Sequence, residues 1–119
     1  NLTFAGYVQP DELKQAYVGC DAYIFPTHEE TEGIVLLEAL AAEANVIIRD
    51  IPVFDWLTDR RDCYKAKDLE DFERLIRAVT SGELPSLQEN GRAAVAGMDI
   101  KKVGEKLLSI YNGTIEQKI

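Results

Sequence analysis

The stretch FPTHEETEGIVLLEALA, which runs from Phe25 to Ala41, decides how the fold of this chain is interpreted. It begins at the end of an apolar run of strand length, Ala22–Phe25, crosses an acidic loop, and enters an apolar helix at Gly33. A second apolar run of strand length, Val46–Ile48, follows that helix. Strands that alternate with helices and lack a polar face are typical of a parallel sheet covered by helices. The sequence therefore predicts an α/β fold.

Further strands and helices are expected around this stretch. Leu2–Ala5 has the length and composition of a strand, and Cys63–Ala66 is a weaker candidate. Apolar residues spaced i, i+3, i+4 predict a helix over Asp11–Gly19. The helix that begins at Gly33 is apolar almost all round, so we expect it to be buried on more than one side.

The second half of the chain is predicted to be helical. Asp68 can cap a helix with a continuous apolar stripe, and Ser86 followed by Glu89 fits a capping box that opens the next helix. Asp99 starts a last helix, which should close near Gly113. The side chains of this last helix that we expect to point inward are Ile100, Val103, Leu107, Leu108 and Tyr111.

Composition excludes several classes of protein. The 119 residues have the length of one domain, and a net charge of -8 argues against a nucleic-acid groove. Cys20, Cys63 and the single histidine, His28, are too few for a structural zinc site, and both cysteines read as reduced packing residues. No apolar run approaches the roughly 20 residues that span a bilayer. Because the chain does not begin with methionine, we expect it to be an excerpt.

Two carboxylates of the opening stretch, Glu30 and Glu38, are candidate ligand-binding residues. On one continuous helix they would lie about 80° and about 12 Å apart, but a loop that carries Glu30 can fold back toward Glu38. Glu38 lies among apolar residues, so we expect it to be mostly buried at the strand-end crevice and to need hydrogen-bond donors there. Vicinal sugar hydroxyls are suitable donors, because one carboxylate can accept from two of them.

The position of this motif also points to a ligand. Ligands of parallel sheets bind at the carboxyl ends of the strands, where the next helix presents free backbone N–H groups. Gly33 would let a ligand approach those amides, because it has no Cβ. Other interpretations stay open: Glu38 can pair with a buried arginine, and Glu29, Glu32 and His28 fit solvated loop positions. The sequence contains no phosphate-binding glycine motif, hydrolase elbow or zinc-peptidase motif.

A family pattern is visible across most of the chain. The matching pieces are Gly6-Tyr7-Val8, Asp11-Glu12-Leu13, Cys20-Asp21-Ala22, Phe25-Pro26-Thr27, and Glu30-Thr31-Glu32-Gly33 through Glu38-Ala39. From Asn1 to about Tyr111 the chain resembles the C-terminal, donor-binding domain of retaining glycosyltransferases with two Rossmann-like domains, the GT-B class. It looks most like bacterial glycolipid synthases that glucosylate diacylglycerol. The resemblance implies that residues 1–119 are a single, truncated sugar-nucleotide-binding domain with a Rossmann-like parallel sheet flanked by helices.

The resemblance also implies an activity and roles for particular residues. The activity would be transfer of a hexose from a nucleotide sugar, UDP-glucose, to an acceptor such as a diacylglycerol lipid. Glu30 would be the catalytic residue and hold the donor sugar, and Glu38 would hold the ribose. The backbone amides of Gly33, Ile34 and Val35 would face the sugar and diphosphate. No metal and no other cofactor is implied.

The partners implied are a nucleotide-sugar donor and a preceding N-terminal acceptor domain, with no nucleic acid. The full-length enzyme would be cytoplasmic and peripheral at the inner face of the membrane. We expect the excerpt to be inactive alone and to self-associate through an unpaired strand edge. The alternative is a non-catalytic, flavodoxin-like or receiver-like α/β interaction module, although Asp21, Asp50 and Asp59 do not fall in a receiver's arrangement.

Overall fold

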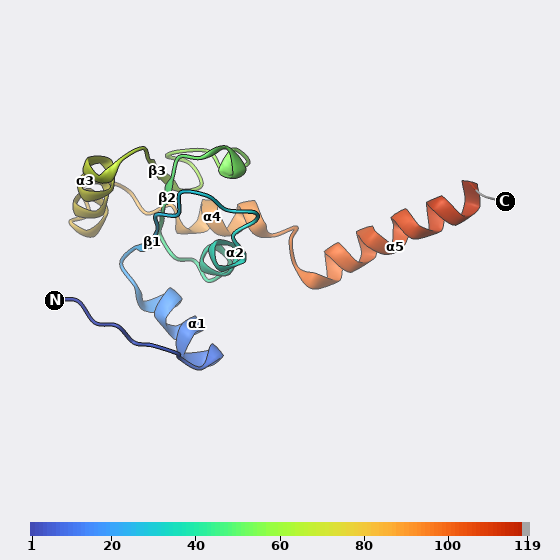
Figure 1. The fold of residues 1–119 in the computed structure, drawn as a ribbon, viewed down its shortest axis with the longest axis horizontal. Helices are drawn as coiled ribbons and strands as arrows, with labels where there is room; N and C mark the ends of the chain where they lie inside the picture. The colour runs from blue at the N-terminus through green and yellow to red at the C-terminus, as the bar shows by residue number, and fades with distance from the viewer. Residues whose placement is uncertain (118–119) are drawn as a thin grey trace.

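The computed structural model of the chain describes residues 1–117 and contains one parallel sheet with strand order β1-β2-β3 (Figure 1). Tyr23 of β1 lies opposite Val46 of β2, and Ile47 of β2 lies opposite Tyr64 of β3. The strands are β1 Tyr23–Phe25, β2 Val46–Arg49 and β3 Tyr64–Ala66. The helices are α1 Pro10–Gly19, α2 Ile34–Ala41, the 3-10 turn η1 Pro52–Phe54, α3 Leu69–Thr80, α4 Gln88–Val95 and α5 Ile100–Gln117.

The sheet separates two apolar layers. Val46 and Ile48 pack in a core with Leu36 of α2 and Val95 of α4, whereas Ile47 packs with α3 on the other face. Successive side chains of a strand point to opposite faces, so an uninterrupted apolar run such as β2 can bury both. The Rossmann-like α/β arrangement expected from the sequence is therefore confirmed, as are the strands expected around residues 22–25, 46–48 and 63–66.

The starts of α3 and α4 differ in how well local sequence predicted them. The Asp68 carboxylate accepts the backbone N–H of Asp71 at 2.8 Å, so the predicted cap of α3 is confirmed. The predicted capping box at Ser86 is wrong, because α4 begins at Gln88 without a side-chain cap. Leu87 is buried, and its N–H donates to the side-chain oxygen of Asn45 at 3.3 Å. This tertiary contact places the helix start beyond the serine.

Two expectations about the first half are wrong. Leu2–Ala5 is irregular and pairs with no strand of residues 1–117, so its backbone groups lack the partner that a strand requires. Helix α2 is buried on one face only: Leu36 and Leu40 are fully buried, whereas Ile34 is exposed. Only one side of α2 meets the sheet and α4, so the apolar residues on its other side remain at the surface.

Helix α5 extends away from the rest of the described molecule (Figure 1). It continues past Gly113 to Gln117, and the five side chains expected to point inward are all exposed. That expectation is wrong, because helical periodicity identifies an apolar face without identifying what it packs against. None of the helices in residues 1–117 is long and apolar enough to cross a membrane.

Candidate functional site

The candidate site lies at the edge of the sheet where all three parallel strands end. At this edge the loop after β1 carries Glu30 and enters α2 at Gly33. Arg49, the last residue of β2, donates from Nε to the Pro26 carbonyl at 3.1 Å and from Nη1 to the Lys67 carbonyl at 3.3 Å. Its guanidinium also lies 5.3 Å from the ring centroid of Phe72. Arg49 therefore connects the segments that follow β1 and β3.

The start of α2 requires glycine. Gly33 has a φ of 76°, in the left-handed region that L side chains rarely adopt. A Cβ there would lie 3.4 Å from each of three carbons, in the side chains of Glu30, Phe25 and Phe54. These distances are ordinary van der Waals contacts, so the preference for glycine comes from the left-handed φ, which a side chain would strain.

The N-terminus of α2 has unpaired backbone donors. The Gly33 carbonyl accepts the first helical hydrogen bonds, and no side chain caps the helix. Within residues 1–117, the N–H groups of Gly33, Ile34 and Val35 donate no hydrogen bond. Free N–H groups at a helix N-terminus, together with the positive end of the helix dipole, favour an anion such as a diphosphate.

Glu30 lies where the sequence predicted it, in the loop beside the start of α2. The side chain is half-buried, and Oε1 accepts the N–H of Thr31 at 3.0 Å. Within the described residues, Oε2 accepts no hydrogen bond. This oxygen can therefore accept from a hydroxyl of a ligand bound at the helix start.

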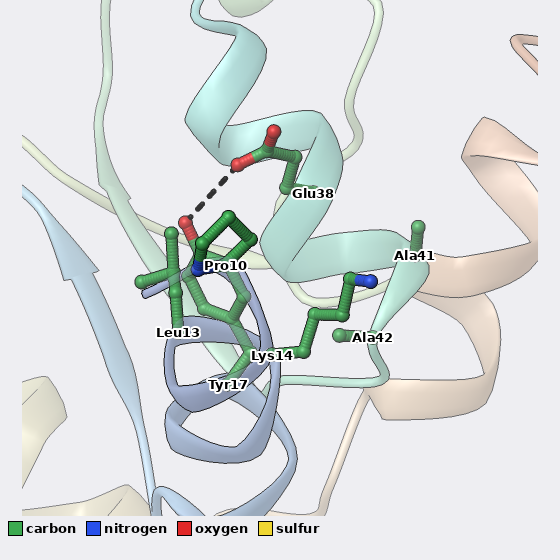
Figure 2. A pocket seen from close by; sticks show the side chains of 7 residues that line it. All are labelled: Pro10, Leu13, Lys14, Tyr17, Glu38, Ala41 and Ala42. Atoms are coloured by element: carbon green, nitrogen blue, oxygen red, sulfur yellow. Dashed lines mark hydrogen bonds between the residues drawn. The ribbon is translucent and has the colours of Figure 1, made fainter. Parts of the chain in front are cut away.

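Glu38 differs from its predicted environment. It is exposed rather than mostly buried, because it lies on the side of α2 that faces α1 and not on the core face. It lines a pocket of about 370 Å³ between the two helices (Figure 2). The other lining residues are Pro10, Leu13, Lys14 and Tyr17 of α1, and Ala41 and Ala42 at the end of α2. Glu30 is not among the residues that line this pocket.

A buried tyrosine contacts the Glu38 carboxylate. The Tyr17 hydroxyl donates to Oε2 of Glu38 at 3.4 Å, and Figure 2 shows the two groups pointing toward each other. Burial, and then the negative charge of Glu38, raise the pKa of Tyr17. Burial chiefly raises the pKa of the neighbouring Tyr23 to about 12. Both phenols therefore remain protonated at neutral pH, and Tyr17 can act as a donor.

The open interpretations of the acidic residues can now be compared with the structure. Within residues 1–117 no arginine pairs with Glu38, so the structure does not support the interpretation that Glu38 serves to pair with a buried arginine. Glu29, Glu32 and His28 are exposed, in agreement with solvated loop positions. No group of three or more histidine, cysteine, aspartate or glutamate side chains gathers in the described part of the chain to hold a metal.

Two contributors to the site were missed at the sequence level. Tyr17 fits the apolar stripe of its helix, so its position indicated packing alone. The only available signal was that a buried tyrosine hydroxyl usually needs a hydrogen-bond partner. Lys65 lies in β3 with a side chain only 9% exposed, and its Nζ donates to the Phe54 carbonyl at 2.9 Å. It thereby supports one of the rings under Gly33. No local pattern pairs residues 54 and 65.

Comparison with known proteins identifies the family of the chain. Residues 1–95 match the family described as "Glycosyl transferases group 1". No solved structure matches the chain.

Several curated relatives are named as glycosyltransferases or glycolipid synthases. The chain is 40% identical over 99% of its length to the processive diacylglycerol alpha-glucosyltransferase of Acholeplasma laidlawii, covering 36% of that protein. It is 32% identical over 85% of its length to the phosphatidyl-myo-inositol mannosyltransferase of Propionibacterium freudenreichii, covering 28% of it. It is also 32% identical over 45% of its length to the alpha-galactosylglucosyldiacylglycerol synthase of Streptococcus pneumoniae, covering 14%. The chain thus spans about a third or less of each relative.

Proposed function

This chain belongs to the group 1 glycosyl transferases, and we propose that it forms part of the C-terminal, donor-binding domain of a GT-B enzyme. The proposed reaction is transfer of a hexose from UDP-glucose to a diacylglycerol lipid. The anomeric carbon would exchange its bond to the diphosphate oxygen for one to an acceptor hydroxyl oxygen, which loses its proton, and UDP would leave. The relative named as a diacylglycerol alpha-glucosyltransferase supports this choice of sugar and acceptor. Membership of the family does not favour the non-catalytic α/β module.

One observation carries the proposal: the half-buried Glu30 lies over Gly33 at the unpaired start of α2. A carboxylate can accept from sugar hydroxyls, while the adjacent N–H groups can hold the diphosphate. The two functions are adjacent because the Glu30 side chain packs against Gly33 at the helix start. In this arrangement the donor sugar would lie against Glu30, with the diphosphate at the amides of Gly33, Ile34 and Val35.

Glu38 has the remaining role in the proposal. It lies one turn further along α2, beside the pocket between α1 and α2, and within residues 1–117 it forms no ion pair. Its two oxygens can accept from the vicinal hydroxyls of the ribose. With a net charge of -8, the chain as a whole attracts a diphosphate poorly, so binding depends on these local donors and acceptors.

The test is kinetics of the complete protein with UDP-glucose as donor. Glu30→Gln should lower kcat strongly, because Glu30 contacts the reacting sugar, and Glu38→Gln should mainly raise the KM for the donor. Loss of one charged hydrogen-bond partner is worth about 1.5–3 kcal/mol, or roughly tenfold to a hundredfold and more. Glu29→Gln, an exposed neighbour in the same loop, is the matched control and should behave as the wild type. Wild-type kinetics for both Glu30→Gln and Glu38→Gln would refute the proposal.

The proposed partners follow from the same assignment. An acceptor-binding domain would supply the lipid site, and the complete enzyme would work in the cytoplasm at the inner face of the membrane.

We also propose that the 119-residue chain self-associates. Within residues 1–117, β1 and β3 each pair with β2 only, so each has an unpaired edge. Sedimentation of the isolated chain tests this, and a strictly monomeric chain at high concentration would contradict it.

A further inference from the structure

We propose that Tyr17 is a positioning residue that orients the Glu38 carboxylate toward the donor. The inference rests on the role proposed above for Glu38 and adds a second residue to it. The two side chains come from different helices, α1 and α2, and meet across the pocket in Figure 2.

Tyr17 is a well-held donor. Its side chain is only 6% exposed, and its ring meets that of Tyr23 edge-on, with the centroids 5.4 Å apart and the planes at 74°. Within the described residues, the acceptor of its hydroxyl is Glu38. A buried hydroxyl that loses its partner carries a desolvation cost, so Tyr17 favours the position of Glu38 in which the bond is made.

Glu38 is the exposed member of the pair. Within residues 1–117, the Tyr17 hydroxyl is the only group that donates a hydrogen bond to the exposed Glu38 side chain. The distance of 3.4 Å exceeds the usual 2.5–3.0 Å for O–H···O bonds, so the bond restrains the carboxylate without holding it rigidly. We therefore expect a modest effect on donor binding.

The geometry determines which kinetic constant should change. Tyr17 engages Oε2 of Glu38 through one lone pair, which leaves Oε1 and the second lone pair of Oε2 for vicinal hydroxyls. Orientation of a carboxylate that contacts the ribose changes how well the donor binds. It does not alter the groups at the reacting carbon, so the KM for the donor should rise while kcat stays nearly constant.

The experiment is a double-mutant cycle in the complete protein. Tyr17→Phe, Glu38→Ala and the double variant are compared by the KM for UDP-glucose and by calorimetric titration with UDP. Tyr64→Phe is the control: this tyrosine is also buried, in the opposite apolar layer, and its hydroxyl donates to the Pro85 carbonyl at 2.6 Å. The Tyr64→Phe variant shows how the loss of a buried tyrosine hydroxyl away from the site affects the fold and, through it, the donor KM.

The expected result is a rise of roughly twofold to tenfold in donor KM for Tyr17→Phe, with none for Tyr64→Phe. In the Glu38→Ala background, which has no acceptor for the Tyr17 hydroxyl, Tyr17→Phe should add little, because its effect passes through the carboxylate. An unchanged KM in Tyr17→Phe, or an equal effect in both backgrounds, would overturn the inference while leaving the proposed function intact. An unchanged KM in Glu38→Ala would instead remove the role of Glu38 itself, and the inference with it.

A second variant keeps the test decisive if Tyr17→Phe does not fold. Glu38→Asp retains the negative charge but shortens the side chain, which draws the carboxylate away from the Tyr17 hydroxyl. A raised donor KM in this variant shows that the position of the carboxylate sets donor affinity, as the inference requires. Wild-type KM in Glu38→Asp would show that the contact with Tyr17 is irrelevant to the donor and would overturn the inference.

Discussion

Replacement of Gly91 by alanine should destabilise the fold, although the same change normally strengthens a helix. Gly91 lies inside α4, where α4 packs against α2. A Cβ at this position would lie 2.8 Å from the carbonyl oxygen of Asp62 and 2.9 Å from Cδ2 of Leu40. Leu40 can shift, but the Asp62 backbone is held in place, because the carboxylate of that residue accepts the N–H of Thr58 at 2.8 Å.

The magnitude follows from two opposing effects. Alanine in a helix interior gains about 1 kcal/mol over glycine. Overfilling a packed contact costs about 1–3 kcal/mol, and here one of the two crowded atoms belongs to the backbone. We therefore expect the free energy of unfolding to fall by up to about 2 kcal/mol, where helix propensity alone would raise it by about 1 kcal/mol.

Urea unfolding followed by circular dichroism measures this difference. Ala93→Gly, at an exposed position of the same helix, is the matched control and should cost about 1 kcal/mol. It calibrates the alanine–glycine difference in α4 without changing the contact to α2. If Gly91→Ala stabilised the protein by as much as Ala93→Gly destabilises it, the close approach of α4 to Asp62 would be refuted.

Two further predictions concern Asp62 and Arg49. The hydrogen bonds from Arg61, followed by that from the Thr58 N–H, lower the pKa of the Asp62 carboxyl, whose side chain is only 5% exposed. The pKa of Asp62 in the folded protein is thus below the unfolded value of about 3.9. The ionised carboxylate therefore stabilises the fold above about pH 3.9, and this contribution is lost as the pH falls through the folded-state pKa. Asp62→Asn should lower the free energy of unfolding at pH 7 by about 1.5–3 kcal/mol and flatten its decline below about pH 4. Asp11→Asn, at an exposed carboxylate that pairs only with the exposed Lys14, is the control. A wild-type acid profile in Asp62→Asn would contradict the assignment. Arg49→Met should cost about 1–2 kcal/mol in urea unfolding and speed hydrogen exchange in the Glu30 loop, because the Pro26 carbonyl loses its partner; unchanged exchange there would contradict it.

The sequence by itself determined the features that depend on near neighbours along the chain. The alternation of apolar runs with helical patterns predicted the parallel sheet, and Asp68 capped α3 as its local pattern required. The placement of Glu30 in a loop and of Gly33 at the helix start could also be predicted, because an acidic segment followed by glycine and an apolar run is a local pattern.

The tertiary structure decided which faces of the helices and strands are buried, because burial depends on the elements that pack against them. Glu38 lies in an apolar run, which predicted burial, yet it is exposed because its side of α2 faces α1 across the pocket. The periodicity of α5 predicted its apolar face but not what packs against that face, and none of its described residues is buried. Leu2–Ala5 likewise had strand composition without a strand beside it in residues 1–117.

The contacts that organise the site join residues far apart in the chain. Tyr17 meets Glu38, Arg49 meets the Pro26 carbonyl, and Lys65 meets the Phe54 carbonyl, each between different segments. Local sequence determines the backbone conformation and the apolar face of an element, because those depend on residues within a few positions. The partner of a side chain depends on how the elements pack together, and in this protein only the folded arrangement of α1, α2 and the sheet brought those groups into contact.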